Sequence, residues 1–231
     1  MLKGIFVAGT DTGVGKTLVA CGLLRALRNR GVDAVGYKPV VTGVEHGRWE
    51  DARALSEACD ACADESLIAP QRFDAPMSPV PAAKLEGKRV DLGISRKALA
   101  ALRTQHACVV AEGIGGLLVP LDEQTLLLDF IRETGFPVVL AARAGLGTIS
   151  HTLLSVRALE AAGVNLAGVV MSVTQAADAA NARPSIDEIQ RHGPRVDLLL
   201  EHLPAALSST ERTRAAAKLL EPLAQKLMEC F

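Results

Sequence analysis

Apolar residues follow two alternating patterns along the chain: short runs rich in small and β-branched residues, and longer stretches with helical spacing. Strands are expected at 4–9, 33–40, 107–113, 136–143 and 165–173, with a weaker run at 195–204. Helices are expected from Lys16 to about Arg30, at 49–62, 95–105, 125–135 and 148–163, and from about Thr210 onward. This alternation is typical of a mostly parallel sheet with helices on both faces, and so predicts an α/β fold.

A proline-rich stretch over residues 70–87 interrupts this alternation. It contains Pro70, Pro76, Pro79 and Pro81, and proline cannot donate a hydrogen bond to a strand ladder. The stretch is therefore expected to be a connection and not a central strand. Because no internal repeat, low-complexity segment or linker is visible, residues 1–231 are expected to form a single domain.

Composition narrows the class of protein. The chain is 49% hydrophobic with a net charge of −1, which is enough for a sizeable core but does not suggest a polyanion-binding surface. Aromatic residues make up only 3%, so base-stacking platforms and a nucleic-acid partner are not expected. The short apolar run near the start is broken by Asp11, and no run approaches the roughly 20 residues of a membrane span. A cytoplasmic protein without membrane contact is therefore expected.

The cysteines also indicate a cytoplasmic protein. There are five, an odd and mostly scattered set, which argues against a disulfide framework and for a reducing compartment. Cys59 and Cys62 form a C-x-x-C pair, but no second cysteine or histidine pair follows. Reduced thiols on a helix are favoured over a metal or redox site.

The segment "FVAGTDTGVGKTLVA" contains a glycine-rich loop between an expected strand and an expected helix. The usual phosphate-loop signature is G-x-x-x-x-G-K-[ST], but Thr10 occupies the first glycine position and Gly9 lies one residue earlier. Loop amides at a helix N-terminus can converge on phosphate oxygens, Lys16 supplies a cation, and the Thr17 hydroxyl can bind Mg²⁺. A P-loop NTPase-like fold is therefore predicted.

Polar residues at other strand ends extend this candidate site, because ligands of such sheets bind at the carboxyl ends of the strands. In "GYKPVVTG", Lys38 is either a solvated lysine or a second cation that helps bring two anions together. In "VVAEGIGGLLVPL", Glu112 is either a helix cap or, as the following glycines favour, part of the metal-binding region of P-loop enzymes. Asp51 lies in the helix after the second strand, and its local sequence alone does not distinguish it from a solvated carboxylate.

Six segments in order resemble the dethiobiotin synthetase family over about residues 4–174: "GTDTGVGKT", "GYKPVVTG", "EDARAL", "AEGIGGLLVPL", "GLGTISHTLL" and "NLAGVV". The resemblance implies an ATP- and Mg²⁺-dependent cyclo-ligase that joins 7,8-diaminononanoate and CO₂ (from bicarbonate) into the cyclic urea of dethiobiotin. The implied intermediates are a carbamate and a carbamic-phosphoric anhydride, and the products include ADP and phosphate. It also implies a homodimer with sites at or near the interface.

The same resemblance implies roles for individual residues. The implied catalytic residues are Thr12, Lys16 and Lys38, and the implied metal ligands are Thr17, Asp51 and Glu112. Nucleotide contacts are implied for Thr12, Gly13, Val14, Gly15, Lys16, Thr17, Glu112, Ser172, Leu203 and Pro204. Substrate contacts are implied for Thr42, Gly116, Leu117, Val119, Pro120, Gly147, Thr148, Ile149 and Ser150.

Four residues depart from the family pattern. Thr42 stands where a serine is common, and Ser150 stands at an asparagine-like position. Relatives often carry Asn-Asp after the strand "NLAGVV", where this chain has Ser172 and Val173 near the expected base site. Since a hydroxyl cannot present the paired donor and acceptor of an amide, weak discrimination between nucleobases is expected.

Two other functions remain as alternatives. Nucleotide-switch ATPases of the partitioning or nitrogenase-iron-protein type share this fold, but their "KGGxGK" loop has a lysine where this chain has Asp11. A passive nucleotide-binding protein would need neither Lys38 nor the glycine-rich segment after Glu112. Both features favour an enzyme with a second substrate.

Overall fold

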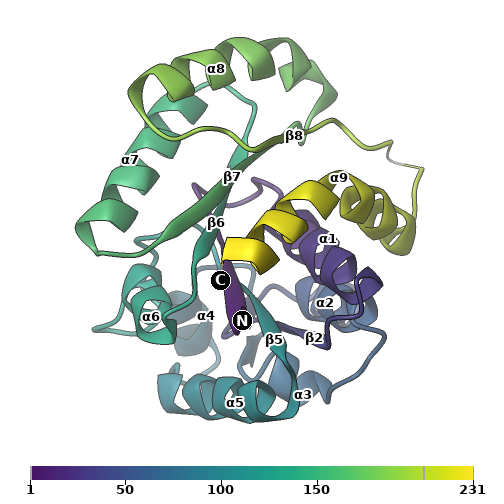
Figure 1. The fold of residues 1–231 in the computed structure, drawn as a ribbon. Helices are drawn as coiled ribbons and strands as arrows, with labels where there is room; N and C mark the ends of the chain where they lie inside the picture. Colours follow the sequence, from purple (N-terminus) through teal and green to yellow (C-terminus); the bar gives the residue numbers. More distant parts are fainter. Residues whose placement is uncertain (1, 205, 231) are drawn as a thin grey trace.

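A six-stranded sheet with the order β2-β5-β1-β6-β7-β8 lies at the centre of this computed structural model, which describes residues 2–204 and 206–230 (Figure 1). Its strands are β1 (Gly4–Gly9), β2 (Ala34–Tyr37), β5 (Cys108–Glu112), β6 (Val138–Arg143), β7 (Leu166–Ser172) and β8 (Leu198–Leu200). All neighbouring pairs are parallel. A separate parallel pair is formed by β3 (Val41–Thr42) and β4 (Arg72–Phe73). The expectation of a parallel sheet is confirmed.

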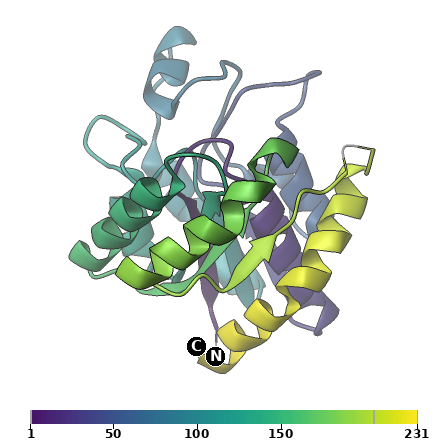
Figure 2. The same ribbon diagram turned by 90° about the horizontal axis from the view of Figure 1, so that it is seen from above.

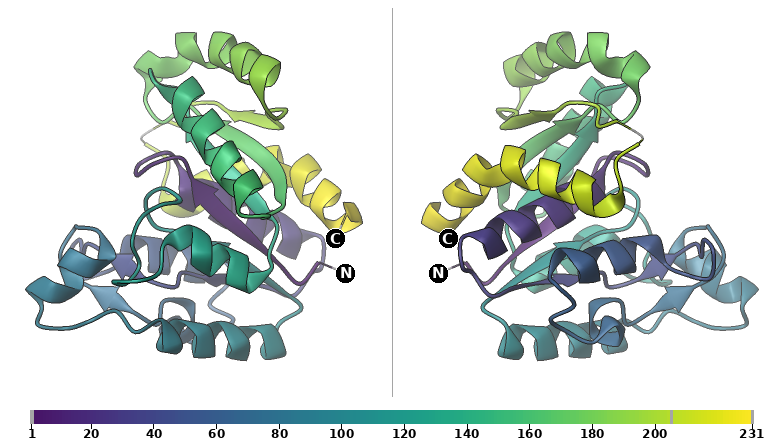
Figure 3. Two further views of the ribbon diagram at one scale, coloured as in Figure 1. Left: turned by 90° about the vertical axis from the view of Figure 1, so that its left-hand side faces the viewer. Right: turned by 90° about the vertical axis from the view of Figure 1, so that its right-hand side faces the viewer.

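Helices cover both faces of the sheet, as expected (Figure 3). One face carries α1 (Lys16–Asn29), α2 (Glu50–Ala58) and α9 (Ser209–Cys230). The other side carries α6 (Leu127–Thr134) and α7 (Thr148–Ala161), with α5 (Leu92–Gln105) and α8 (Ala179–His192) toward the two edges. Shorter helical segments are α3 (Glu65–Ile68), α4 (Pro79–Leu85) and the 3₁₀ turn η1 (Ala176–Asp178).

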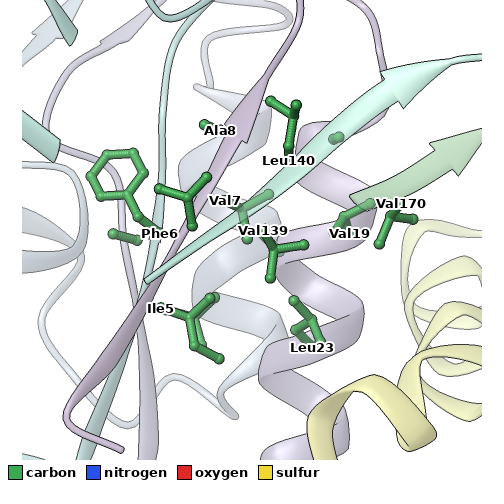
Figure 4. Close-up of a cluster of buried hydrophobic side chains, with 14 of the residues drawn as sticks. Ile5, Phe6, Val7, Ala8, Val19, Leu23, Val139, Leu140 and Val170 are labelled. Atoms are coloured by element: carbon green, nitrogen blue, oxygen red, sulfur yellow. The ribbon is translucent and has the colours of Figure 1, made fainter. Parts of the chain in front are cut away.

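The core is thickest around β1, whose residues are all buried. Ile5 and Val7 of β1 lie beside Val139 of β6, with Val19 and Leu23 of α1 packed close to them (Figure 4). A strand buried on both faces reads as a continuous apolar run, which is why "GIFVAG" lacks alternation. This packing fixes both the strand before the phosphate loop and the helix after it.

The parallel arrangement gathers the loops that follow the strands at one end of the molecule. Figure 2 shows this end opposite the start of β1 and the end of α9. Strands β5 and β2 lie on one side of β1. Strands β6, β7 and β8, which come later in the chain, extend the sheet on the other side. The strand order therefore reverses beside β1, at the kind of position where ligands bind in such sheets.

Several elements differ from the sequence-based expectation. The helix expected over 49–62 ends at Ala58, because Asp60 and Ala61 have φ values of 58° and 50°. The proline-rich stretch contains α4, which starts at Pro79, where the missing amide costs no helical hydrogen bond. Helix α8 was not expected, and Pro184 lies inside it. The expected exclusion of the four prolines from the central sheet is confirmed.

Among residues 2–204 and 206–230, no helix combines the length and the apolar character needed to cross a membrane.

Candidate active site

The phosphate loop turns from β1 directly into α1. Gly13 and Gly15 adopt φ values of 70° and 90°, in the left-handed region that favours glycine. Gly15 is the N-cap of α1, and no side chain caps this helix end. A Cβ atom on Gly15 would lie only 3.1 Å from Ser172 Oγ. The loop therefore closes tightly over β7 and leaves a helix N-terminus available for an anion.

Lys16 folds back over its own loop. Its Nζ donates a hydrogen bond of 2.7 Å to the backbone oxygen of Asp11. Its stem packs over Gly9, where an added Cβ atom would lie 2.8 Å from Lys16 Cδ. The early glycine therefore makes room for the lysine. Burial, with a smaller contribution from nearby Lys38, lowers the pKa of Lys16 to about 8.

Four polar side chains from different elements meet beside this loop. Lys38 follows β2 directly, Glu112 ends β5, Asp51 lies in the first turn of α2, and Thr17 lies in the first turn of α1. Lys38 Nζ donates to Asp51 Oδ2 at 2.6 Å and to Glu112 Oε1 at 2.7 Å. Thr17 Oγ1 lies 2.9 Å from Asp51 Oδ1 and 2.8 Å from Glu112 Oε1. Lys38 and Glu112 are almost fully buried, with 2% and 0% of the residue exposed.

The electrostatics of this cluster keep Lys38 charged. Burial favours its neutral form, but attraction to Glu112 and Asp51 outweighs burial and raises the Lys38 pKa. For Asp51, the effect of burial is outweighed by the Lys38 charge and by hydrogen bonds from Lys38 and Thr17, so its pKa is lowered. Burial raises the pKa of Glu112.

The donor set suits a hard cation such as Mg²⁺. Thr17, Asp51 and Glu112 offer oxygen atoms only, and the buried Glu112 Oε2 has no hydrogen-bond partner among the described residues. No cluster of three or more His, Cys, Asp or Glu side chains able to hold a metal occurs within residues 2–204 and 206–230. Mg²⁺ is usually held by one or two carboxylates together with substrate phosphates, so this site fits a cation that arrives with a nucleotide.

A cavity of about 620 Å³ opens over the loop and the cluster. Its lining includes ten of the expected residues: Thr12, Gly13, Gly15, Lys16, Thr17, Lys38, Thr42, Asp51, Glu112 and Val119. The sequence interpretation missed Pro76, Met77 and Ser78, which also line it. Ser172 is only 3% exposed, and Thr174 lines the cavity in its place.

A second hollow of about 560 Å³ adjoins the first and shares Ser78 and Val119 with it. Its lining includes the expected substrate residues Gly116, Leu117 and Pro120. Besides the buried Val14 and Ser172, six expected contact residues line neither space: Gly147, Thr148, Ile149, Ser150, Leu203 and Pro204. In a single copy of the chain, Gly147 to Ser150 therefore lie outside both spaces, although His151 and Leu154 of α7 line the second hollow.

Residues 3–213 match a family model described as an AAA domain. Solved structures similar to this chain share its fold at low sequence identity. The cell division ATPase MinD of Pyrococcus furiosus aligns over 100% of both chains with a TM-score of 0.59 and 16% identity. The ParA protein of pNOB8, solved bound to nonspecific DNA, covers 99% of this chain and 98% of its own, with a TM-score of 0.59 and 12% identity. Fold and loop together define a P-loop NTPase-type protein.

Curated relatives are far more similar in sequence. The ATP-dependent dethiobiotin synthetase BioD of Anaeromyxobacter dehalogenans is 45% identical over 219 residues, which is 95% of this chain and 97% of the relative. The enzyme of the same name from Bacillus licheniformis is 36% identical over 188 residues, covering 81% of this chain and 77% of the relative. The chain belongs to the dethiobiotin synthetase family.

Proposed function

We propose that this chain catalyses the ATP-dependent carboxylation and ring closure of 7,8-diaminononanoate with CO₂ to form dethiobiotin. The single observation that carries the proposal is the 45% identity to a dethiobiotin synthetase over 95% of the chain. The geometry supports it, because the phosphate loop and the buried cation Lys38 face one cavity with room for a second substrate. Residues 1–231 are proposed to act as one domain.

The loop would bind the nucleotide phosphates through its amides and Lys16. Thr17, Asp51 and Glu112 would hold Mg²⁺, whose charge neutralises phosphate oxygens when it is bound with the nucleotide. Thr12, Gly13 and Gly15 line the cavity beside them. Val14 is fully buried, so its proposed contribution to nucleotide binding is through its backbone.

The chemistry requires two anions to approach each other. One amine of the substrate takes up CO₂, loses a proton and becomes a carbamate, whose oxygen then attacks the γ-phosphate of ATP and displaces ADP. Lys16 and Lys38 would lower the repulsion by stabilising the negative charge on phosphate and carbamate oxygens. The second amine then attacks the carbonyl carbon of the resulting anhydride, closes the ring and releases phosphate. No covalent intermediate on the protein is needed.

We also propose that the active form is a homodimer. Leu118 and Leu154 are 61% and 65% exposed and both line the second hollow, and a second copy would cover them. The uncapped N-terminus of α7, with Gly147 at φ 87°, would then offer an anion site for the carboxylate tail of a substrate bound to the partner copy. This arrangement would explain why Gly147 to Ser150 lie outside the cavity of one copy.

The decisive experiment measures ATP hydrolysis by the purified protein with each substrate omitted in turn. Phosphate release is expected only when Mg²⁺, diaminononanoate and bicarbonate are all present, with dethiobiotin formed in equal amount. EDTA should abolish both products. ATP hydrolysis that proceeds equally well without diaminononanoate would instead indicate a nucleotide-switch ATPase.

A further inference from the structure

Lys38 occupies the place that the proposed function gives to a metal ion. Its Nζ lies between Asp51 Oδ2 and Glu112 Oε1, at 2.6 Å and 2.7 Å. The residue is only 2% exposed, although it follows a strand at the edge where solvated lysines are common. Its buried ammonium group thus pairs with both carboxylates.

A divalent cation bound by the same two carboxylates would meet this ammonium group at close range. Like charges repel strongly over such distances when water is largely excluded, and two of the carboxylate oxygens already accept hydrogen bonds from Lys38. Without Lys38, however, Asp51 and Glu112 would repel each other in a poorly hydrated place, where an unpaired charge is costly. One cation between the two carboxylates relieves this repulsion, and Lys38 supplies it.

We propose that Lys38 is the resident cation of the nucleotide-free site: it holds the position between Asp51 and Glu112 and leaves it when a metal–nucleotide complex binds. The inference rests on the proposed function only in taking Asp51 and Glu112 as metal ligands. Lys38 would thus position the carboxylates in the empty site and direct its ammonium group into the cavity once phosphates are present.

This exchange makes metal binding conditional on the nucleotide. A metal ion alone would have to displace a paired, buried ammonium group that gains no new partner. A metal–nucleotide complex supplies phosphate oxygens that serve both as further metal ligands and as a new partner for Lys38. Metal and nucleotide therefore bind cooperatively, and each raises the affinity for the other by the same factor.

Lys16 provides a matched control. It is also a buried lysine in the same cavity, 7% exposed, but its Nζ donates to the backbone oxygen of Asp11 and to neither carboxylate. Removing its charge leaves the Lys38 pairs intact. Only the loss of Lys38 removes the ammonium group that pairs with both carboxylates.

The test measures Mn²⁺ binding to nucleotide-free protein from the electron paramagnetic resonance signal of free Mn²⁺. Lys38→Met keeps an unbranched side chain one atom shorter and removes its charge, and is expected to bind one Mn²⁺ at least about tenfold more tightly than the wild type. That added site should disappear in Lys38→Met combined with Asp51→Asn. Lys16→Met should bind Mn²⁺ as weakly as the wild type does.

Two results would overturn the proposal. One is a Lys38→Met protein that gains no Mn²⁺ affinity over the wild type, or no more than Lys16→Met gains. The other needs no lysine variant: it is a wild type that binds Mn²⁺ as tightly without nucleotide as with a non-hydrolysable ATP analogue, at a site that Asp51→Asn abolishes, because Lys38 does not occupy such a site. Because no assay contains diaminononanoate, failure of ring closure and failure of this exchange are separate results.

Discussion

At the scale of single residues, the two lysines of the cavity differ in what they contact. Lys16 covers the phosphate loop and donates to Asp11 oxygen, whereas Lys38 donates to Asp51 and Glu112. The sequence suggested Lys16 as a cation for the phosphates and Lys38 either as a solvated lysine or as a second cation facing the same pocket. In the structure, Lys16 lies over the phosphate loop and Lys38 lies between two carboxylates.

Lys16→Ala and Lys38→Ala are both expected to lower the rate of ring closure by roughly a hundredfold or more, because each removes stabilisation of developing negative charge. Lys16→Ala should also weaken binding of Mg–ATP. Lys38→Ala should leave this affinity largely intact, because the lost contact to phosphate is offset by the release of Asp51 and Glu112 for the metal. Single-turnover rates and calorimetric titration with a non-hydrolysable ATP analogue would distinguish them. Near-normal turnover by Lys38→Ala would exclude that residue from the mechanism.

The residues expected near the nucleobase also differ from the family pattern. Ser172 and Val173 are each 3% exposed, so neither presents a polar group freely to a base, and only Thr174 reaches the cavity. A hydroxyl donates one hydrogen bond and cannot match the donor and acceptor edge of adenine as an amide does. We therefore expect the protein to discriminate weakly between nucleobases.

GTP and CTP are expected to support ring closure, with kcat/KM for ATP exceeding theirs by less than about a thousandfold. The measurement compares the three triphosphates at saturating diaminononanoate and bicarbonate. A much larger preference for ATP would mean that groups elsewhere read the base, such as the backbone near Leu203 and Pro204.

At the scale of elements, the position of the phosphate loop depends on how α1 packs. One side of α1 lies on the sheet, and α9 packs closely along it (Figure 3). Gly22 of α1 faces α9 closely: an added Cβ atom would lie 2.6 Å from Leu220 Cδ1 and 3.0 Å from Ala216 Cβ. The C-terminal helix therefore supports the helix that carries Lys16 and Thr17.

Gly22→Val should separate α1 from α9 and lower the free energy of unfolding by about 1–3 kcal/mol, as overpacking usually does. Urea denaturation followed by circular dichroism measures the effect. Lys218→Ala, an exposed change on the same α9, serves as the control and should change stability by less than about 0.5 kcal/mol. Equal stability of the two variants would show that the helices have room to adjust.

At the scale of the whole molecule, the second hollow is bordered by exposed leucines on two separate segments. Leu118 follows the glycine-rich turn after β5, and Leu154 lies on α7. The proposed homodimer buries both. A charge placed there should prevent association without affecting the phosphate loop.

Leu154→Glu is expected to sediment as a monomer and to lose ring closure, while keeping its fold and its affinity for nucleotide. Leu219→Glu is the control, because Leu219 is 42% exposed on α9, away from this hollow, and should leave the dimer intact. Analytical ultracentrifugation at the assay concentration gives the answer. A wild-type monomer with full activity would contradict the dimer proposal.

The sequence by itself determined the features that depend on neighbouring residues. Apolar runs and helical spacing predicted the parallel sheet with helices on both faces, and "GTDTGVGKT" between a strand and a helix predicted the phosphate loop. Family resemblance pointed to a dethiobiotin synthetase, and the relatives confirm it. These inferences succeed because periodicity, loop glycines and motif order are all read along the chain.

Only the tertiary structure decided what the polar groups of the site contact. Lys38 and Glu112 are 74 positions apart, and they meet because β2 and β5 are adjacent and end at the same edge of the sheet. The same holds for Pro76 and Ser78, which come to the cavity from a stretch that looked like a plain connection. Whether a lysine after a strand is solvated or held between two carboxylates depends on strand order and burial, and local sequence encodes neither directly.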